Sequence, residues 1–393
     1  KIMTGTLKPI LGYLMLAAGA GVIVSNLDPL GKMIEHGFHI TGVVPNNEAI
    51  VAVAQKVLGV ETMSILVVGL LMNLLIARFT KFKYVFLTGH HSLFMACLMS
   101  AVLGTAGLSG IELILVGGFL MGAWSAISPA IGQSYTSKVT DGDEIALGHF
   151  GSLGYYLSAW VAKYVGKAEE STEDIEIPEK WGFLRDSTLS TALTMIVFYL
   201  IAAIAAGSEF VATLSGSMSP YLFAVMSAMN FAVGVAIVYS GVRMILGDLI
   251  PAFQGIATKI IPNAIPAVDC AVFFTYAPTA VVLGFISSFI GGIIGMLILG
   301  AVGGVLIIPG LVPHFFCGAT AGIYGNATGG RRGAAVGAFL NGLAITFLPA
   351  LALPVLGQLG FQNTTFGDAD FAVIGLVLGN AFEWIGMAGI YGV

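Results

Sequence analysis

Long apolar stretches recur along the chain, with short polar connections between them. A helix that crosses the hydrocarbon core of a bilayer needs about 20 predominantly apolar residues. The pattern therefore predicts an all-α, polytopic integral membrane protein with about nine to eleven membrane segments. The expected segments are Ile10–Ser25, Ala49–Ala77, Tyr84–Leu103, Ile111–Ile131, Ile145–Tyr164, Thr188–Ala206, Tyr221–Ile245, Ala280–Ile308, Ala334–Leu356 and Phe371–Val393.

Prolines interrupt this pattern in the second half of the chain. Four lie between Gly247 and Thr279, and Pro309 and Pro313 mark a second break. Proline lacks a backbone N–H and breaks or kinks a helix. Irregular backbone at membrane depth is tolerated only inside protein or beside a water-filled cavity. The breaks therefore predict discontinuous helices that lie near a solute pathway.

The composition supports a membrane protein. Of 393 residues, 57% are apolar and 9% are Asp, Glu, Lys or Arg, whereas soluble domains carry about 25% charged residues. A net charge of −5 gives no reason to expect nucleic acid as a partner. The chain starts at Lys1, directly before an apolar stretch, and shows no cleavable signal peptide. We expect one further helix to precede Lys1, and a location in the bacterial plasma (inner) membrane.

The charged residues divide the chain into two halves. Residues 165–187 form a hydrophilic loop of mixed charge between a first membrane region, 1–164, and a second, 188–393. Short basic clusters at 78–83 and 331–332 are expected in the cytoplasm by the positive-inside rule. If the loop is also cytoplasmic, one of the three segments between it and Arg78 must be re-entrant. Ile145–Tyr164 is the best candidate, because a polar run precedes it.

Faint similarities link the two halves. Three pairs of short segments occur in the same order in each half, and inverted repeats with broken helices are typical of transporters. The order predicts an internal repeat. The pairs are Ile10–Leu14 with Ile245–Leu249, Val44–Asn46 with Ile261–Asn263, and His90–Phe94 with His314–Phe316.

Asp269 is the leading functional candidate, because ionisable groups inside membrane segments are costly and usually functional. It lies between Pro266 and Pro278, where the backbone is expected to be broken. Its carboxylate can accept hydrogen bonds from solute hydroxyls or take a proton. The alternative is that Asp269 caps the N-terminus of a half-helix, and the two roles are compatible.

Two histidines that follow glycines are the next candidates. His90 follows Thr88 and Gly89, and His149 follows Gly148. Neutral imidazole both donates and accepts hydrogen bonds, which suits a polyhydroxyl or enolic solute. Alternatively, each histidine joins two helices by a hydrogen bond. Weaker candidates are His91, His314, Asp248 and Glu383.

The chain offers no soluble-enzyme chemistry. Cys97, Cys270 and Cys317 lie in apolar stretches without metal-ligand spacing, so neither a disulfide nor a metal site is predicted. Gly329–Gly333 lacks the Lys-Ser/Thr ending of a phosphate loop. We therefore expect no catalytic residue and no cofactor in this chain.

Several motifs follow one another along nearly the whole chain. They are Leu87–His90; Val139–Gly142 with Gly148–His149; Pro262–Ala264, Ala267–Ala271 and Ala277–Pro278; Ile307–Gly310 with Pro313 and Phe315–Phe316; and Gly166–Ser171. In this order they resemble the ascorbate-specific membrane component (EIIC) of the bacterial phosphotransferase system.

The resemblance implies a homodimer in the lipid bilayer. Each subunit would have a core domain that moves like an elevator and a scaffold-like dimerisation domain, both drawn from the two halves. A soluble EIIB protein, charged through EIIA, would phosphorylate the solute, so the phosphorylated residue would lie on EIIB. The binding residues that carry over are His90, His149 and Asp269, with Thr88 and Gly89 beside them.

Three positions depart from the pattern of the family. Phe94 and Phe150 stand where ascorbate carriers have glutamines, and Ala20 replaces a small polar residue. If the two rings face the pocket, the solute should present an apolar face or fewer hydroxyls than ascorbate. The alternative is that both rings pack in the protein core, where Phe is common.

Two functions fit the sequence. One is an EIIC permease for ascorbate or a related sugar acid or polyol. The other is a secondary transporter on the same fold, with a proton or Na⁺ bound at Asp269 as the coupling ion. A channel fits less well, because the charged loops offer no selectivity ring.

Overall fold

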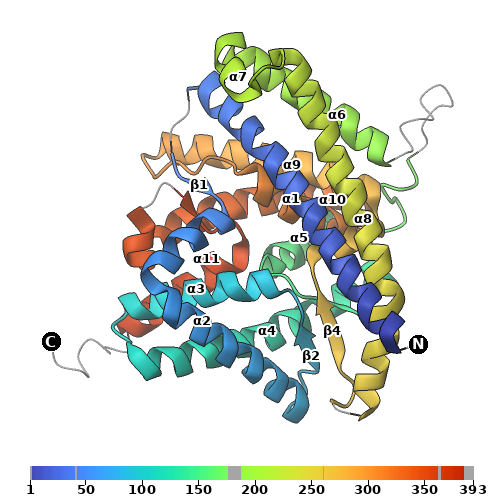
Figure 1. Cartoon of the computed structure of the whole chain (residues 1–393), viewed down its shortest axis with the longest axis vertical. Coiled ribbons are helices and arrows are strands. Elements are labelled where there is room, and N and C mark those ends of the chain that lie inside the picture. Colours follow the sequence, from blue (N-terminus) through green and yellow to red (C-terminus); the bar gives the residue numbers. More distant parts are fainter. Residues whose placement is uncertain (1, 40–41, 176–186, 260, 362–363, 385–393) are drawn as a thin grey trace.

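The computed structural model describes residues 2–39, 42–175, 187–259, 261–361 and 364–384. Most of these residues are helical (Figure 1). The helices are α1 (Ile2–Gly37), α2 (Asn47–Phe79), α3 (Gly89–Thr105), α4 (Gly110–Thr140), α5 (Ser152–Val165), α6 (Ser187–Ala206), α7 (Ser208–Ser215), α8 (Pro220–Lys259), α9 (Pro278–Ala301), α10 (Leu311–Ala352) and α11 (Ala369–Trp384), with 3₁₀ helices η2 (Cys270–Thr275) and η3 (Leu353–Phe361).

Six of the described helices are long and apolar enough to cross a membrane, which confirms a polytopic membrane protein. They are Ile10–Gly37, Leu58–Phe79, Gly110–Thr140, Pro220–Ile237, Pro278–Ala301 and Leu311–Gly357. A bent pair, Met195–Ala206 and Ser208–Ser215 with 118° between them, would make a seventh. The sequence prediction of about nine to eleven segments also counted α3, α5 and α11, which are shorter. Side chains such as Val60, Ile204 and Leu297 expose apolar surface along these helices, as expected for contact with lipid.

Short parallel strands join the helices, and the all-α prediction missed them. β4 (Ile265–Val268) lies between β2 (Tyr84–Phe86) and β3 (Ala146–Leu147). β1 (Val44–Pro45) pairs with β5 (Thr364–Thr365), and Val43 forms a bridge with Ile307. Backbone N–H and C=O groups at membrane depth must find partners inside the protein. These ladders supply partners where the helices are interrupted.

The two halves of the chain are interleaved through these strands. β4 comes from the second half and pairs with two strands of the first half. Conversely, β1 comes from the first half and pairs with backbone of the second. Each sheet therefore contains backbone from both halves of the chain.

The helices form two groups (Figure 1). α1 and α8 pack along each other, and α6 packs against both. In the other group α10 packs against α9 and α5, while α2 packs against α3 and α4. α1 from the first half and α6 and α8 from the second thus form one side of the molecule.

The predicted break between Gly247 and Thr279 starts later than expected. α8 continues through Pro251 to Lys259, since proline is tolerated inside membrane helices more often than in soluble ones. The irregular backbone comes after α8 and contains β4 and η2.

α5 is shorter than a membrane span. Its 14 residues reach about 21 Å at 1.5 Å per residue, against about 30 Å of hydrocarbon. The predicted segment Ile145–Tyr164 therefore consists of a strand and a short helix. Its re-entrant course stays a prediction.

The loop between the halves is partly a structural element, although residues 176–186 lie outside the described ranges. The Glu173 carboxylate accepts hydrogen bonds from the backbone N–H groups of Thr279 and Ala280 at the start of α9. The Arg331 N–H donates to the Glu170 carbonyl over 2.8 Å at a kink in α10. At that kink Gly330 has a φ of +58°, which favours glycine.

Candidate functional site

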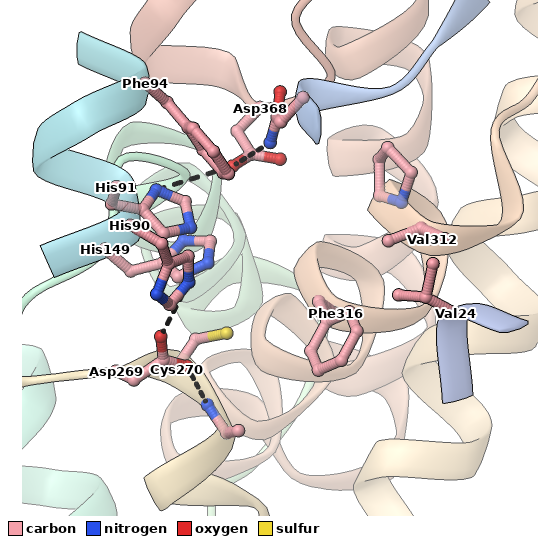
Figure 2. Close-up of a pocket in the computed structure, with 13 residues that line it drawn as sticks. Val24, His90, His91, Phe94, His149, Asp269, Cys270, Val312, Phe316 and Asp368 are labelled. Atoms are coloured by element: carbon pink, nitrogen blue, oxygen red, sulfur yellow. Dashed lines mark hydrogen bonds and ion pairs between the residues drawn. The ribbon is translucent and has the colours of Figure 1, made fainter. Parts of the chain in front are cut away.

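A small cavity lies where the carboxyl ends of the strands meet (Figure 2). Its volume is about 90 Å³, well below the 300–1,000 Å³ typical of drug-sized ligands, which suits a small solute. The lining combines polar residues that follow the strands with an apolar surface from α1 and α10. The lining residues are Val24, Asn47, His90, His91, Phe94, His149, Asp269, Cys270, Ala271, Val312, Pro313, Phe316 and Asp368.

Asp269 follows β4. It caps a short helix, as one interpretation expected, and it lies beside His90 at the cavity, as the other expected. Its Oδ1 accepts a hydrogen bond from the Ala271 N–H over 3.0 Å, so it caps η2. Its Oδ2 lies 3.3 Å from Nε2 of His90, the second residue of α3. The cap therefore fixes one carboxylate oxygen and leaves the other facing His90 and the cavity.

His149 is fixed in one tautomer by its neighbours. The Gly151 N–H and the Tyr155 hydroxyl approach its Nδ1 at 3.1 and 2.9 Å. A backbone N–H can only donate, so Nδ1 holds the lone pair and the neutral ring carries its hydrogen on Nε2. His149 can therefore donate a hydrogen bond from Nε2.

His91 is held in the same tautomer. The Phe150 N–H donates to its Nδ1 over 3.3 Å. The ring centroid lies 3.7 Å from that of His149 and 4.8 Å from that of His90. Three imidazoles thus line one wall of the cavity (Figure 2).

Glycine is required beside His149 because the backbone there lies against a strand. A Cβ on Gly148 would clash with the Ala267 carbonyl of β4, so Gly148 permits close approach to the strand. A Cβ on Gly89 would meet open space. The glycine before His149 therefore positions the histidine against the sheet.

Asp370 holds the segment after His149 in place. It is fully buried and accepts hydrogen bonds from the Ser152 hydroxyl, the Leu153 N–H and the Trp124 indole over 2.7, 2.9 and 3.2 Å. It thereby caps the N-terminus of α5. Its own N–H donates to the Phe150 carbonyl over 3.0 Å, which ties α11 to the His149 segment.

The structure brings most of the predicted site residues together. His90, His149 and Asp269, the three residues that carry over from the family resemblance, all line the cavity, and so does Phe94. Their role in binding a solute stays a prediction. Thr88 is buried at the N-cap of α3, and Gly89 is the first residue of that helix.

Phe150 does not line the cavity, which corrects the expectation for this position. Its ring is fully buried and stacks on Phe86, with 4.6 Å between centroids. The side chain of Ala20, in α1, lies outside what the structure describes, as do those of Asp248 and Glu383.

The sequence interpretation missed Asn47 and Asp368 and ranked His91 too low. Both missed residues are buried and line the cavity. Each lies just after a strand and at or near the start of a helix, where polar residues are common as caps. His314 lines no part of the cavity, and its Nδ1 lies 2.9 Å from the Ser288 hydroxyl.

Two groups of side chains in the site are close enough to suggest a metal. They are His91, His149 and Asp368, and His149, Asp269 and Cys270, with atoms within 4.8 Å of one another. However, Nδ1 of both histidines accepts a backbone N–H, so Nε2 carries the hydrogen and offers no lone pair. The geometry favours a hydrogen-bonding pocket over a metal site.

The apolar spans define a multi-pass membrane protein, and the cavity between the strand ends is its candidate functional site. The family model for EIIC-GAT, described as the PTS system sugar-specific permease component, matches residues 1–370. The chain belongs to this family of bacterial membrane proteins, which confirms the family resemblance of its sequence motifs.

One curated relative is the ascorbate-specific PTS system EIIC component of Mycoplasma pneumoniae. The two are 25% identical, and the match covers 83% of this chain. The match covers 57% of the length of that relative.

Proposed function

We propose that this chain is the membrane permease of a phosphotransferase system and carries a sugar-like solute through the cavity at the strand ends. The observation that carries the proposal is the convergence of His90, His149 and Asp269 on that cavity. These are the residues that the sequence motifs single out. Family membership over residues 1–370 supports the same class of function.

Each polar residue has a distinct role in this proposal. His149 donates from Nε2 to a solute oxygen, because its Nδ1 is already occupied. Asp269 accepts a hydroxyl hydrogen at Oδ2, and His90 moves off this oxygen to contact the solute. Phe94 closes the cavity beside these residues.

In this proposal the residue that carries the phosphoryl group and donates it to the solute lies on a separate EIIB protein. Cys97, Cys270 and Cys317 are all buried, so none of them is open to a soluble phosphoryl donor. The solute is phosphorylated at the cytoplasmic face after it leaves the cavity. The curated relative is named as ascorbate-specific, so ascorbate is the first solute to test.

The two membrane regions, 1–164 and 188–393, form an inverted repeat around the 165–187 loop. Support comes from the order of elements. In the first half, α1, β1, α2, β2, α3, α4, β3 and α5 follow one another. In the second, the corresponding order is α8, β4, α9, the Ile307 backbone, the two segments of kinked α10, β5 and α11.

The two helix groups supply the scaffold and the moving core. α1, α6 and α8 form the scaffold through which two chains associate as a homodimer. The remaining helices carry the strands and the cavity, and move together across the membrane. Cross-linking of cysteines introduced on α6, in vesicles, would test the dimer, and a lack of cross-linked dimer at any position along α6 would contradict it.

The proposal is tested by uptake into proteoliposomes that contain EIIA, EIIB and the general phosphocarrier enzymes. Labelled ascorbate and a panel of neutral sugars and polyols are added with and without phosphoenolpyruvate. Accumulation of a phosphorylated solute that requires phosphoenolpyruvate supports the proposal. Accumulation of unmodified solute driven by a proton or Na⁺ gradient contradicts it.

A further inference from the structure

A second polar group lies at the opposite end of the cavity from Asp269 (Figure 2). Asp368 accepts hydrogen bonds from Asn47 Nδ2 at Oδ2 over 3.2 Å and from the Cys317 thiol at Oδ1 over 3.1 Å. The Gly367 N–H donates to Asn47 Oδ1 over 2.8 Å. This backbone contact fixes the amide so that its NH₂ group faces Asp368.

Both oxygens of Asp368 face hydrogen-bond donors, the Asn47 amide and the Cys317 thiol. Hydrogen bonds to the ionised form of an acid favour that form, so this arrangement favours the carboxylate. His91 Nδ1 lies 3.8 Å from Oδ2, too far for a hydrogen bond. Because this nitrogen accepts the Phe150 N–H, the His91 ring is neutral beside the carboxylate.

The cavity therefore has a carboxylate at each end. Figure 2 shows Asp368 and Asp269 at opposite ends, with the three imidazoles between them, and Val24, Val312 and Phe316 across the cavity. Among the described residues that line it, none is Lys or Arg. A solute that fills this space lies close to both carboxylates.

We infer that Asn47, His91 and Asp368 form a second solute subsite, and that the two carboxylates make the pocket select an uncharged polyhydroxyl solute over a monoanion. This inference rests on the proposed function and defines its substrate class. Carboxylates accept hydrogen bonds from hydroxyl groups. Like charges in a site of low dielectric repel one another strongly, so an acid anion such as ascorbate is a poor ligand.

The test measures equilibrium binding of two matched probes to the purified full chain in lipid nanodiscs. L-Ascorbate is a monoanion at neutral pH, and L-gulono-1,4-lactone is a neutral six-carbon lactone of the same ring size. We expect the wild-type protein to bind the lactone at least about tenfold more tightly than ascorbate. In Asp368→Asn, the affinity for ascorbate should rise about tenfold or more. The ratio of lactone affinity to ascorbate affinity should therefore be smaller than in the wild type.

The matched control is Asp28→Asn, which removes a carboxylate on the exposed face of α1, where Asp28 pairs with Lys32 over 2.8 Å. The ratio of the two affinities should stay at the wild-type value in this variant. The wild-type ratio needs no variant, so it tests the inference even if Asp368→Asn does not fold.

Three results would overturn the inference. In one, wild-type protein binds ascorbate more tightly than the lactone. In another, folded Asp368→Asn keeps the wild-type ratio, which would remove Asp368 from the subsite. Failure of folded wild-type protein to bind either probe or any sugar of the uptake panel would instead overturn the proposed function, and the subsite with it.

Discussion

The two short sheets have a similar backbone plan and very different side chains at their carboxyl ends. The β2-β4-β3 sheet is followed by His90, Asp269 and His149, which line the cavity. At the other sheet, Asn47 follows β1 and Asp368 follows β5. Ile307, which forms a bridge with Val43 beside β1, is followed by the apolar Val312 at the cavity. The comparison teaches that the backbone builds the cavity from both halves, whereas the hydrogen-bonding imidazoles come from the first half alone.

The histidines near the starts of α3 and α10 differ in what they contact. His91, near the start of α3, lines the cavity. His314, near the start of α10, is buried and paired with Ser288. A histidine near the start of a helix thus lines the cavity in the first half, whereas in the second half it forms a hydrogen bond between packed helices.

The largest effect is expected at Phe150, which is buried behind the His149 segment. Phe150→Gln removes a ring that stacks on Phe86 and buries an amide without a partner. The free energy of unfolding should fall by about 3 kcal/mol or more, measured by reversible unfolding in detergent micelles. Phe94→Gln, at the cavity, should instead change solute affinity severalfold. If Phe150→Gln is as stable as wild type and binds ascorbate better, the placement of Phe150 is wrong.

The next effect is expected at Asp269, the carboxylate at the end of the central strand. Asp269→Asn keeps Oδ1 as the acceptor for the Ala271 N–H, so η2 should stay capped. It removes the charge next to His90, and hydrogen bonds to charged groups contribute about 1.5–3 kcal/mol. The affinity for the uncharged L-gulono-1,4-lactone, measured by calorimetry, should fall about 10- to 100-fold. Wild-type affinity in this variant would exclude Asp269 from the binding site.

A smaller effect is expected at Tyr155, which positions His149 without touching the solute. Tyr155→Phe removes one of the two hydrogen bonds to Nδ1, a loss of about 1 kcal/mol or roughly fivefold in affinity. Tyr199→Phe is the control, because the Tyr199 hydroxyl donates to the Asn26 carbonyl between α6 and α1, outside the cavity. Equal losses of affinity in both variants would refute a specific role for Tyr155.

The smallest effect on binding is expected at Ser288, the partner of His314. Ser288→Ala removes a 2.9 Å hydrogen bond and should lower stability by about 1 kcal/mol. Solute affinity should stay unchanged, because His314 does not line the cavity. A clear loss of affinity would show that the second-half histidine also serves the solute.

The sequence was most informative where polarity interrupts an apolar stretch. Asp269 and His90 stand out because a charged or imidazole side chain at membrane depth needs a specific reason. The broken backbone around each, together with the family resemblance, singled them out as binding residues. This reasoning located the side of the site at the β2-β4-β3 sheet.

The side of the site at β1 and β5 was hidden by two physical features. The strands are two to four residues long, too short for an alternating pattern to predict them. Their pairing also joins distant positions, such as Thr364 and Val44, which are 320 residues apart. Without these contacts, Asn47 and Asp368 resemble ordinary capping residues, and nothing indicates that they face Asp269 across a cavity.

The central claim is that solute binds between residues from both halves of the chain, and a cryo-EM structure of the full protein with bound L-gulono-1,4-lactone tests it most directly. We predict solute density between the imidazole wall and Val312, within hydrogen-bonding distance of Asp269 at one end and Asp368 at the other. Density that contacts residues of one half alone, or that lies outside this cavity, would contradict the account.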